Sequence, residues 1–360
     1  MLEGQVAALH SQVLDGEHLL KTLTALRESS LYVPDRNTYL LYPDRQIAPV
    51  WERNKIPESK IASCSVIHEL LKFEDNPIVR RDETGVVRFH ADAANAMELK
   101  EQLRTYLDRI GLQFSEDSMR TLEDLFEEVF NHHEFTGRST TFFAYEGLNS
   151  VYWHMVSKLL LALQENIFRL GLKEKQLDDL RRYYFAIRHG LGYSQGSERF
   201  GAFACDPYSH SPENAPARQP GMTGQAKEDI LIRLGELGLR PDGGALRICP
   251  ILLRSEDFNA SEHTLEWAPN PGPACYKLTF PADSLAFLYL GQPFVYYLST
   301  QADPEQSEIT VKADHHDILY RGKGELSPEI TRRLAQRDSG LLQVEVSLHP
   351  SCLCSGEAAY

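Results

Sequence analysis

The stretch that decides the fold is residues 131–170, NHHEFTGRSTTFFAYEGLNSVYWHMVSKLLLALQENIFRL. Apolar side chains recur every three or four residues from Leu148 to Ile167, which predicts a long amphipathic helix. A second stripe of this helix is polar and aromatic, and it carries Glu146, Trp153, His154 and Lys158. Such a helix is typical of the wall of a polar cavity. The same pattern also fits a core helix with one solvated face, so both interpretations stay open.

Composition places the chain among soluble globular proteins and limits its partners. Of its 360 residues 42% are hydrophobic and 24% are charged, which is enough apolar material for a sizeable core. The formal net charge of −14 argues against nucleic acid and against an anionic membrane surface, since both attract clustered Lys and Arg. No apolar run reaches the length of a transmembrane helix. We therefore expect a neutral or small partner molecule.

The cysteines and the first residues bear on location. Six cysteines are scattered without a CxxC pair, and residues 1–12 lack the basic and apolar regions of a signal peptide. Reduced thiols in the cytoplasm are the expected state. The opening sequence resembles the middle of a longer polypeptide. We therefore expect one part of a larger protein, or a chain that forms a homo-oligomer.

The periodicity changes from helical to strand-like near residue 243. Amphipathic patterns dominate residues 1–243, whereas short apolar or alternating runs separated by turn residues dominate residues 244–360. One short helix, at about 327–337, interrupts the strands. The prediction is an α+β protein, with an all-α domain at 1–243 followed by an antiparallel, sandwich-like β-rich domain at 244–360.

Residues 190–222 stand apart because they show no usable period. Glycines, prolines and four aromatic residues are mixed in this stretch, whereas disordered linkers are poor in aromatic residues. We expect an ordered loop that folds back over the polar side of the central helix and encloses a site. Its polar side chains are Asp206, Tyr208, His210, Arg218 and Gln219.

No familiar catalytic fingerprint is present in the chain. We find no GxGxxG after a strand, Walker loop, HExxH, GxSxG or EF-hand loop, and we expect no cofactor apart from inorganic phosphate as a co-substrate. His132, His133 and Glu134 cluster in sequence, but adjacent helical residues point about 100° apart and rarely bind one ion together. A metal-dependent hydrolase that uses His132, His133 or His210 remains an alternative.

Paired carboxylates favour glycosyl transfer. That chemistry needs an acid near the leaving oxygen and a second group at the anomeric centre, and phosphate takes the second part in phosphorolysis. Glu146 lies among aromatic residues, and partial burial there would raise its pKa toward that of a working acid. Asp206 is the candidate for the second carboxylate, and Glu228 is the next choice for this role. Alternatively, Glu146 simply favours a helix N-terminus.

Other side chains near these carboxylates suit a sugar ligand. The aromatic candidates for contact with sugar rings are Tyr145, Trp153, Tyr193 and Tyr208. The candidates that would hold hydroxyl groups or phosphate are Arg138, His154, Lys158, His210, Arg218, Gln219 and Lys227.

Several motifs resemble a known family. They are FTGRS at 135–139, YEGL at 145–148, YWHMVSKL at 152–159, GAF at 201–203, DPYSH at 206–210, QPGMTGQ at 219–225 and KE at 227–228. Together they resemble large bacterial proteins described as cellobiose-phosphorylase-like or as glycoside-active. The resemblance implies an α-helical toroid with an appended β region, and a carbohydrate as substrate.

The function expected from these observations is the binding and processing of a glucan-type oligosaccharide by phosphorolysis or hydrolysis. Glu146 or Asp206 would supply the acid. A different class of function also fits, namely a non-catalytic carbohydrate-binding or scaffolding part of a larger protein. The metal-dependent hydrolase is the third hypothesis.

Overall fold

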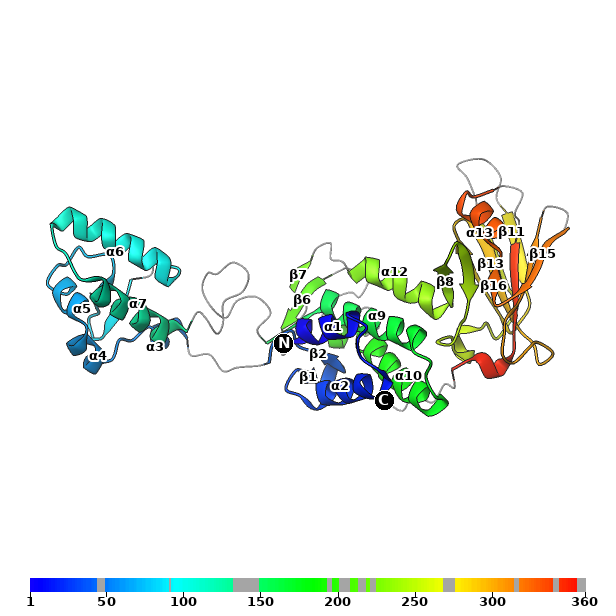
Figure 1. Ribbon diagram of the computed structural model, residues 1–360, viewed down its shortest axis with the longest axis horizontal. Coiled ribbons are helices and arrows are strands. Elements are labelled where there is room, and N and C mark those ends of the chain that lie inside the picture. Colours follow the sequence, from blue (N-terminus) through cyan, green and yellow to red (C-terminus); the bar gives the residue numbers. More distant parts are fainter. Residues whose placement is uncertain are drawn as a thin grey trace. The chain divides into compact units, whose positions relative to one another are not determined.

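The computed structural model divides the chain into two compact units, shown in Figure 1. The larger unit comprises Met1–Tyr39 and Val151–Tyr360, and the inserted unit comprises Leu40–Ser150. The structure describes residues 1–43, 49–90, 92–131, 149–192, 196–200, 208–212, 218–220, 225–267, 276–313, 317–338 and 343–354.

The two ends of the inserted unit lie side by side. The backbone N–H of Leu41 donates to the carbonyl of Ser150 at 2.8 Å, so the chain leaves and returns at one place. Neighbouring ends are what allow one domain to be inserted into another. This division differs from the predicted boundary at residue 243. The change from helices to strands that suggested the boundary is present, but it lies inside the larger unit.

One helix is central to the larger unit. Before its strand-rich part, the larger unit contains the helices α1 (Leu2–His10), α2 (Gly16–Glu28), α9 (Trp153–Arg169), α10 (Glu174–His189), α11 (Ser197–Phe200) and α12 (Gln225–Glu236). Between α2 and the insertion lie β1 (Tyr32–Val33), η1 (Pro34–Arg36) and β2 (Thr38–Tyr39). α9 packs against α1, α10 and α12. The five consecutive residues from Leu159 to Leu163 are all buried, so α9 is covered on every side.

The start of α9 differs from the expected continuous helix. Residues Ser150–Tyr152 form the strand β5, and α9 begins only at Trp153. β5 joins a three-stranded sheet in the order β5-β6-β7, with β6 at Tyr208–Pro212 and β7 at Arg218–Pro220. β6 also contacts α9. Segment 190–222 was predicted to fold back onto the central helix, and its described strand β6 does contact α9. Sequence reasoning had treated the residues of β6 and β7 as a loop.

The C-terminal part is built from strands, as predicted. They are β8 (Leu239–Asp242), β9 (Ala245–Ile248), β10 (His263–Trp267), β11 (Tyr276–Phe280), β12 (Ser284–Tyr289), β13 (Gln292–Leu298), β14 (Glu308–Lys312), β15 (Ile318–Lys323), β16 (Glu325–Leu326) and β17 (Gln343–Leu348). Three short helices accompany them: η3 (Ser255–Asp257), α13 (Pro328–Ala335) and η5 (Pro350–Cys352). α13 confirms the short helix expected at 327–337.

Two of the sheets share one hydrophobic core. The larger sheet has the order β12-β13-β17-β14-β15, in which β13 and β17 pair in parallel and the other neighbours pair antiparallel. The smaller has the order β16-β9-β8. In β17, Val344, Val346 and Leu348 alternate into the core, where they meet Leu246 and Ile248 of β9. The fold is therefore mixed α+β, and its described helices do not establish the toroid that the resemblance implied.

The inserted unit has a hydrophobic core of its own. Its elements are α3 (Val50–Arg53), α4 (Glu58–Ser63), α5 (Ser65–Leu70), β3 (Val79–Arg81), β4 (Val87–Phe89), α6 (Ala96–Ile110) and α7 (Glu116–Phe130). Asn95 and Ser115 accept backbone N–H groups at the starts of α6 and α7. Phe89, Phe126 and Phe130 pack their rings together in the core. This unit thus satisfies the requirement for a compact domain.

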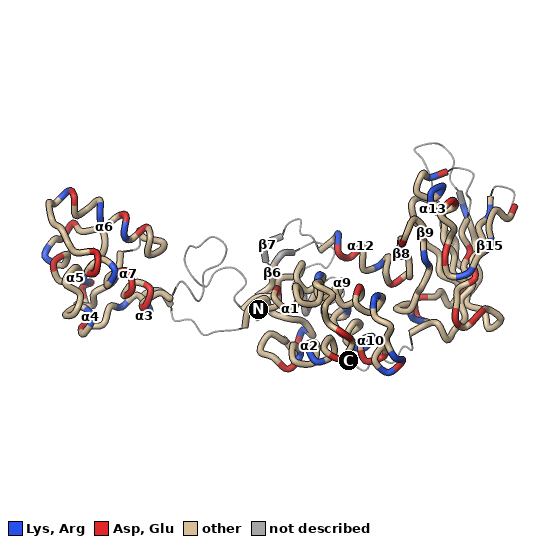
Figure 2. The backbone as a smooth tube through the Cα atoms, in the orientation of Figure 1, with Lys and Arg blue, Asp and Glu red and all other residues tan. Residues whose placement is uncertain are grey.

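Charges of both signs alternate along the described chain, as Figure 2 shows for α6, α10 and α12. Within the described residues, no helix is both long and apolar enough to cross a lipid bilayer.

Gly190, directly after α10, tests the packing in the larger unit. A Cβ at this position would lie 1.7 Å from the backbone carbonyl oxygen of Asn37. We expect Gly190→Ala to lower the free energy of unfolding by about 1–3 kcal/mol, because the rigid backbone of residue 37 must move. Gly171→Ala is the control, since nothing lies within 4 Å of its Cβ position. Chemical denaturation measures both, and equal stability of the two variants would contradict the packing described here.

The charge of the Asp82 carboxylate should make the stability of the inserted unit depend on pH. Hydrogen bonds from Thr84 Oγ1 (2.6 Å) and Arg88 Nε (2.7 Å) hold the pKa of its carboxyl well below the usual range. A depressed folded pKa gives stability above the unfolded pKa of about 3.9, and this stability is lost as the pH falls toward the folded pKa. Asp82→Asn should therefore speed amide exchange in β3 and β4 at pH 7, with a smaller difference from wild type below pH 4.

The exposed Asp108 on α6 provides the control for this measurement. Asp108→Asn should leave exchange in β3 and β4 unchanged at every pH. An Asp82→Asn effect that is the same at pH 7 and below pH 4 would show that the charge of the carboxylate is not what stabilises the turn.

Candidate functional site

A histidine and a glutamate meet where two helices begin. His154 is the second residue of α9, and Glu228 lies in the first turn of α12. His154 Nε2 lies 3.2 Å from Glu228 Oε1, and the side chains are 20% and 9% exposed. Both residues were predicted as site residues, but nothing in their sequence positions had paired them. The fold of the larger unit brings them together.

The position of the pair at helix N-termini follows from local physical chemistry. The first N–H groups of a helix have no partner within the helix, and the helix dipole makes this end electropositive. A carboxylate such as Glu228 is therefore favourable in the first turn of α12. The side chain of Tyr152, the N-cap residue of α9, makes no capping hydrogen bond. Two electropositive helix ends thus converge on His154 and Glu228.

Several buried polar atoms around this pair have no hydrogen-bond partner within the described residues. They are His154 Nε2, Ser157 Oγ, Glu228 Oε2 and Asp229 Oδ1. The close contact between His154 and Glu228 is not aligned as a hydrogen bond, which is why Nε2 is among them. An unsatisfied buried polar group costs about 1–3 kcal/mol, so such a cluster marks a place where another polar group binds.

Two aromatic rings extend the site toward β6. The ring of His210 stacks on the ring of Tyr152, with centroids 4.6 Å apart and planes 6° from parallel. The hydroxyl of Tyr152 lies 3.4 Å from Nδ1 of His154. When Nε2 of His154 carries the proton, the Tyr152 hydroxyl is the donor to Nδ1. Tyr152, His154 and Glu228 therefore lie next to one another, with Tyr152 Oη 3.4 Å from His154 Nδ1 and His154 Nε2 3.2 Å from Glu228.

Trp153 has a different position from the one predicted. It is completely buried, and its Nε1 donates to Ser211 Oγ, also buried, at 2.8 Å. The ring is thus not available for stacking on a sugar, because core side chains cover it. Trp153 instead ties the start of α9 to β6, which fixes His154 and His210 relative to each other.

The other predicted residues divide into three groups. Lys158 is half-buried on α9, one turn after His154, whereas Lys227 is exposed on α12. Tyr208, Arg218 and Gln219 belong to β6 and β7, where the backbone is described. The remaining candidates, Arg138, Tyr145, Glu146, Tyr193 and Asp206, lie outside the described residues.

Sequence reasoning missed Tyr152 and Ser211 as members of the site. Tyr152 was assigned to the apolar face because the helical period was extended through it. A strand of three residues, Ser150–Tyr152, is too short to show an alternating pattern. No signal in the sequence singled out Ser211.

In the part of the chain that the structure describes, no cluster of side chains supports the hypothesis of a metal-dependent hydrolase. No three His, Cys, Asp or Glu side chains gather there in an arrangement that would hold an ion. His210 is described and stacks on Tyr152, whereas His132 and His133 lie outside the described residues.

Comparison with known families gives one match. Residues 49–133 match the family model described as GH149 phosphorylase insertion domain 2. These residues fall within the inserted unit, Leu40–Ser150, so the family description and the observed insertion agree. No curated protein matches the chain. The match covers residues 49–133, so it shows that this region of the chain is similar to an insertion domain of glycoside phosphorylases.

Proposed function

We propose that this chain binds a glucan-type oligosaccharide and cleaves its glycosidic bond with inorganic phosphate. The observation that carries the proposal is the pair of half-buried His154 and buried Glu228 at the convergent N-termini of α9 and α12, in a chain with a region similar to a phosphorylase insertion domain. Hydrolysis, in which water replaces phosphate, uses the same groups and is the closest variant.

The electrostatics of the site suit an anionic co-substrate. Helix N-termini are ready-made sites for phosphate because their N–H groups and dipoles face the anion. Here two such ends meet, and His154 adds a group that becomes cationic on protonation. Glu228 occupies part of this positive field and limits it to the space beside the pair.

The chemistry requires a proton as well as an anion. In phosphorolysis a phosphate oxygen attacks the anomeric carbon, the bond to the leaving oxygen breaks, and that oxygen takes up a proton. Glu146 and Asp206 remain our proposals for the acid. We propose that the path from Tyr152 through His154 to Glu228 holds and orients the proton, because Glu228 is 7% exposed and its Oε2 has no partner within the described residues.

Glu228→Gln tests the pair directly. The amide keeps the shape of the side chain but cannot exchange a proton, so phosphate-dependent turnover should fall about 10²–10⁴-fold. A sugar-phosphate assay measures the rate, and the melting temperature checks the fold. The matched control is Glu165→Gln, because Glu165 lies on the same helix as His154 and also lies 3.2 Å from a histidine, His10, but both side chains are exposed. Turnover unchanged in Glu228→Gln would remove the pair from the reaction.

Glu146→Gln tests the proposed acid. Turnover should be abolished while the melting temperature stays within the error of wild type, since the amide keeps the size of the side chain and removes only the proton donor. A series of leaving groups provides the control: substrates with good leaving groups need less protonation and should be less affected. If Glu146→Gln retains full turnover with poor leaving groups, the acid is another residue.

The non-catalytic alternative also has an observation in its favour. The matched region is an insertion domain, which is not by itself the part of a phosphorylase that performs the reaction. If the chain is a binding or scaffolding part, calorimetry with an oligosaccharide will show heat of binding, and neither sugar phosphate nor reducing sugar will appear in a parallel assay.

A further inference from the structure

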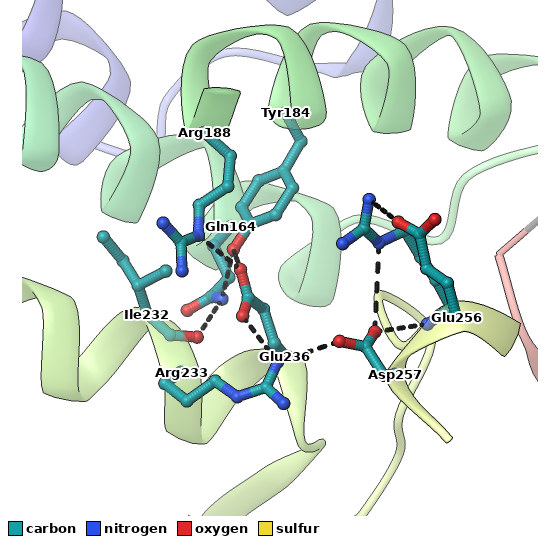
Figure 3. Close-up of polar contacts among 9 residues, drawn as sticks. Gln164, Tyr184, Arg188, Ile232, Arg233, Glu236, Glu256 and Asp257 are labelled. Carbon is teal, nitrogen blue, oxygen red and sulfur yellow. Dashed lines mark hydrogen bonds and ion pairs between the residues drawn. The ribbon is translucent and has the colours of Figure 1, made fainter. Parts of the chain in front are cut away.

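A cavity of about 370 Å³ lies elsewhere in the larger unit, between α10, α12 and the segment from Leu252 to Asp257. Three arginines line it: Arg188 from α10, Arg233 from α12, and Arg254 from the segment before η3. Figure 3 shows Arg188 and Arg233 on either side of Glu236. None of these residues belongs to the candidate site described above.

The acidic residue at the centre of this cluster is fully engaged. Glu236 is 4% exposed and accepts hydrogen bonds from Tyr184 Oη at 2.9 Å, Arg188 Nε at 3.1 Å and Arg233 at 3.0 Å. Gln164 Nε2 donates to Tyr184 Oη and to the carbonyl of Ile232, which fixes the tyrosine. Burial raises the pKa of Tyr184 well above its usual range, so its hydroxyl remains a donor to Glu236. This network holds two of the arginines in place.

Within the described residues, Arg233 and Arg254 keep donors that the carboxylates of the lining do not use. Each guanidinium group has five N–H donors in a rigid planar arrangement. Arg233 also lies 3.5 Å from Asp257 Oδ1, which is beyond the usual hydrogen-bond distance. The Nε of Arg254 is buried and has no hydrogen bond within the described residues, and Asp257 Oδ2 is 3.9 Å away. The cavity therefore offers more directed donors than acceptors.

The walls of the cavity orient the third arginine. The guanidinium carbon of Arg254 lies 4.8 Å from the centroid of the Phe185 ring, so the group rests against an aromatic face. The lining side chains carry three guanidinium groups against the carboxylates of Glu236 and Asp257. Glu256 contacts Arg254 but is not part of the lining. With Glu256 counted, three guanidinium groups stand against three carboxylates, so the surplus of the cavity lies in directed N–H donors and not in net charge.

We propose that this cavity binds a small tetrahedral oxyanion, either inorganic phosphate or the phosphate group of a phosphate ester. Planar guanidinium groups match phosphate oxygens in geometry as well as in charge, and several converge here. The volume of about 370 Å³ is at the lower end for ligand pockets, which suits phosphate with no more than one sugar-sized substituent.

The proposed oxyanion site is separate from the pair at the start of α12. Glu228 and Glu236 are eight residues apart on that helix, which corresponds to about 12 Å along its axis. One phosphate cannot serve both places. The inference therefore does not rest on the proposed function. A ligand here would connect α10 and α12 with the segment before η3, and would stabilise the folded larger unit by mass action.

Arg254→Gln tests the site in the full chain. Calorimetry should detect inorganic phosphate bound to the wild type, with affinity at least about tenfold weaker in Arg254→Gln because a charged donor is lost. The matched control is Arg240→Gln: Arg240 rests on Phe168 at 4.7 Å in the same way but does not line the cavity. Wild type and both variants are compared in a His154→Gln background, so that phosphate bound at the candidate catalytic site does not contribute to the measured heat.

Asp257→Asn gives a prediction of opposite sign. Removing this carboxylate leaves the arginines in place and takes away a competing negative charge, so phosphate should bind several-fold more tightly. This variant also decides the matter if Arg254→Gln fails to fold. Tighter binding of a hexose phosphate than of phosphate would identify an ester as the ligand, whereas the reverse would identify free phosphate. The proposal is overturned if phosphate does not bind at millimolar concentration, if Arg254→Gln folds and binds it normally, or if Asp257→Asn binds it no better.

Discussion

The burial of α9 is the constraint on which the rest of the larger unit depends. Its middle residues are covered on all sides by α1, α10 and α12, so its position is fixed by packing rather than by one apolar face. Because α12 packs against α9, Glu228 is held against His154. Because Trp153 donates to Ser211, β6 is held at the start of the same helix. A buried helix of this kind provides the rigid support that a site needs for fixed geometry.

The chain is divided into a larger unit and an inserted unit. The inserted unit has its own core and capped helices, and its ends are joined by one backbone hydrogen bond between Leu41 and Ser150. The family match falls within this unit, so the similarity to a phosphorylase insertion domain and the geometry of the candidate site come from different parts of the chain. The two lines of evidence are independent for that reason.

α12 carries a polar cluster at each end, and the two clusters differ in how completely they are satisfied. At its start, Glu228 retains a buried oxygen without a partner in the described part of the chain. At its end, Glu236 accepts three hydrogen bonds, and the surplus lies instead with the arginines around it. Because Glu228 has an acceptor without a partner in the described residues and Arg254 has such a donor, the two ends of α12 suit different ligands. The first position suits a group that donates or shares a proton, and the second suits an anion.

The amino-acid sequence alone determined the long helices of the larger unit, the helix α13, the strands after residue 243 and the choice of His154, His210 and Glu228 as polar candidates. These follow from local periodicity and residue chemistry, which act over a few turns or strands. Tertiary structure decided that Ser150–Tyr152 is a strand, that Trp153 is core and that Glu228 faces His154. It also decided that Leu40–Ser150 is an insertion with its own core. Each of these depends on contacts between residues distant in sequence, whose free energy no local pattern records.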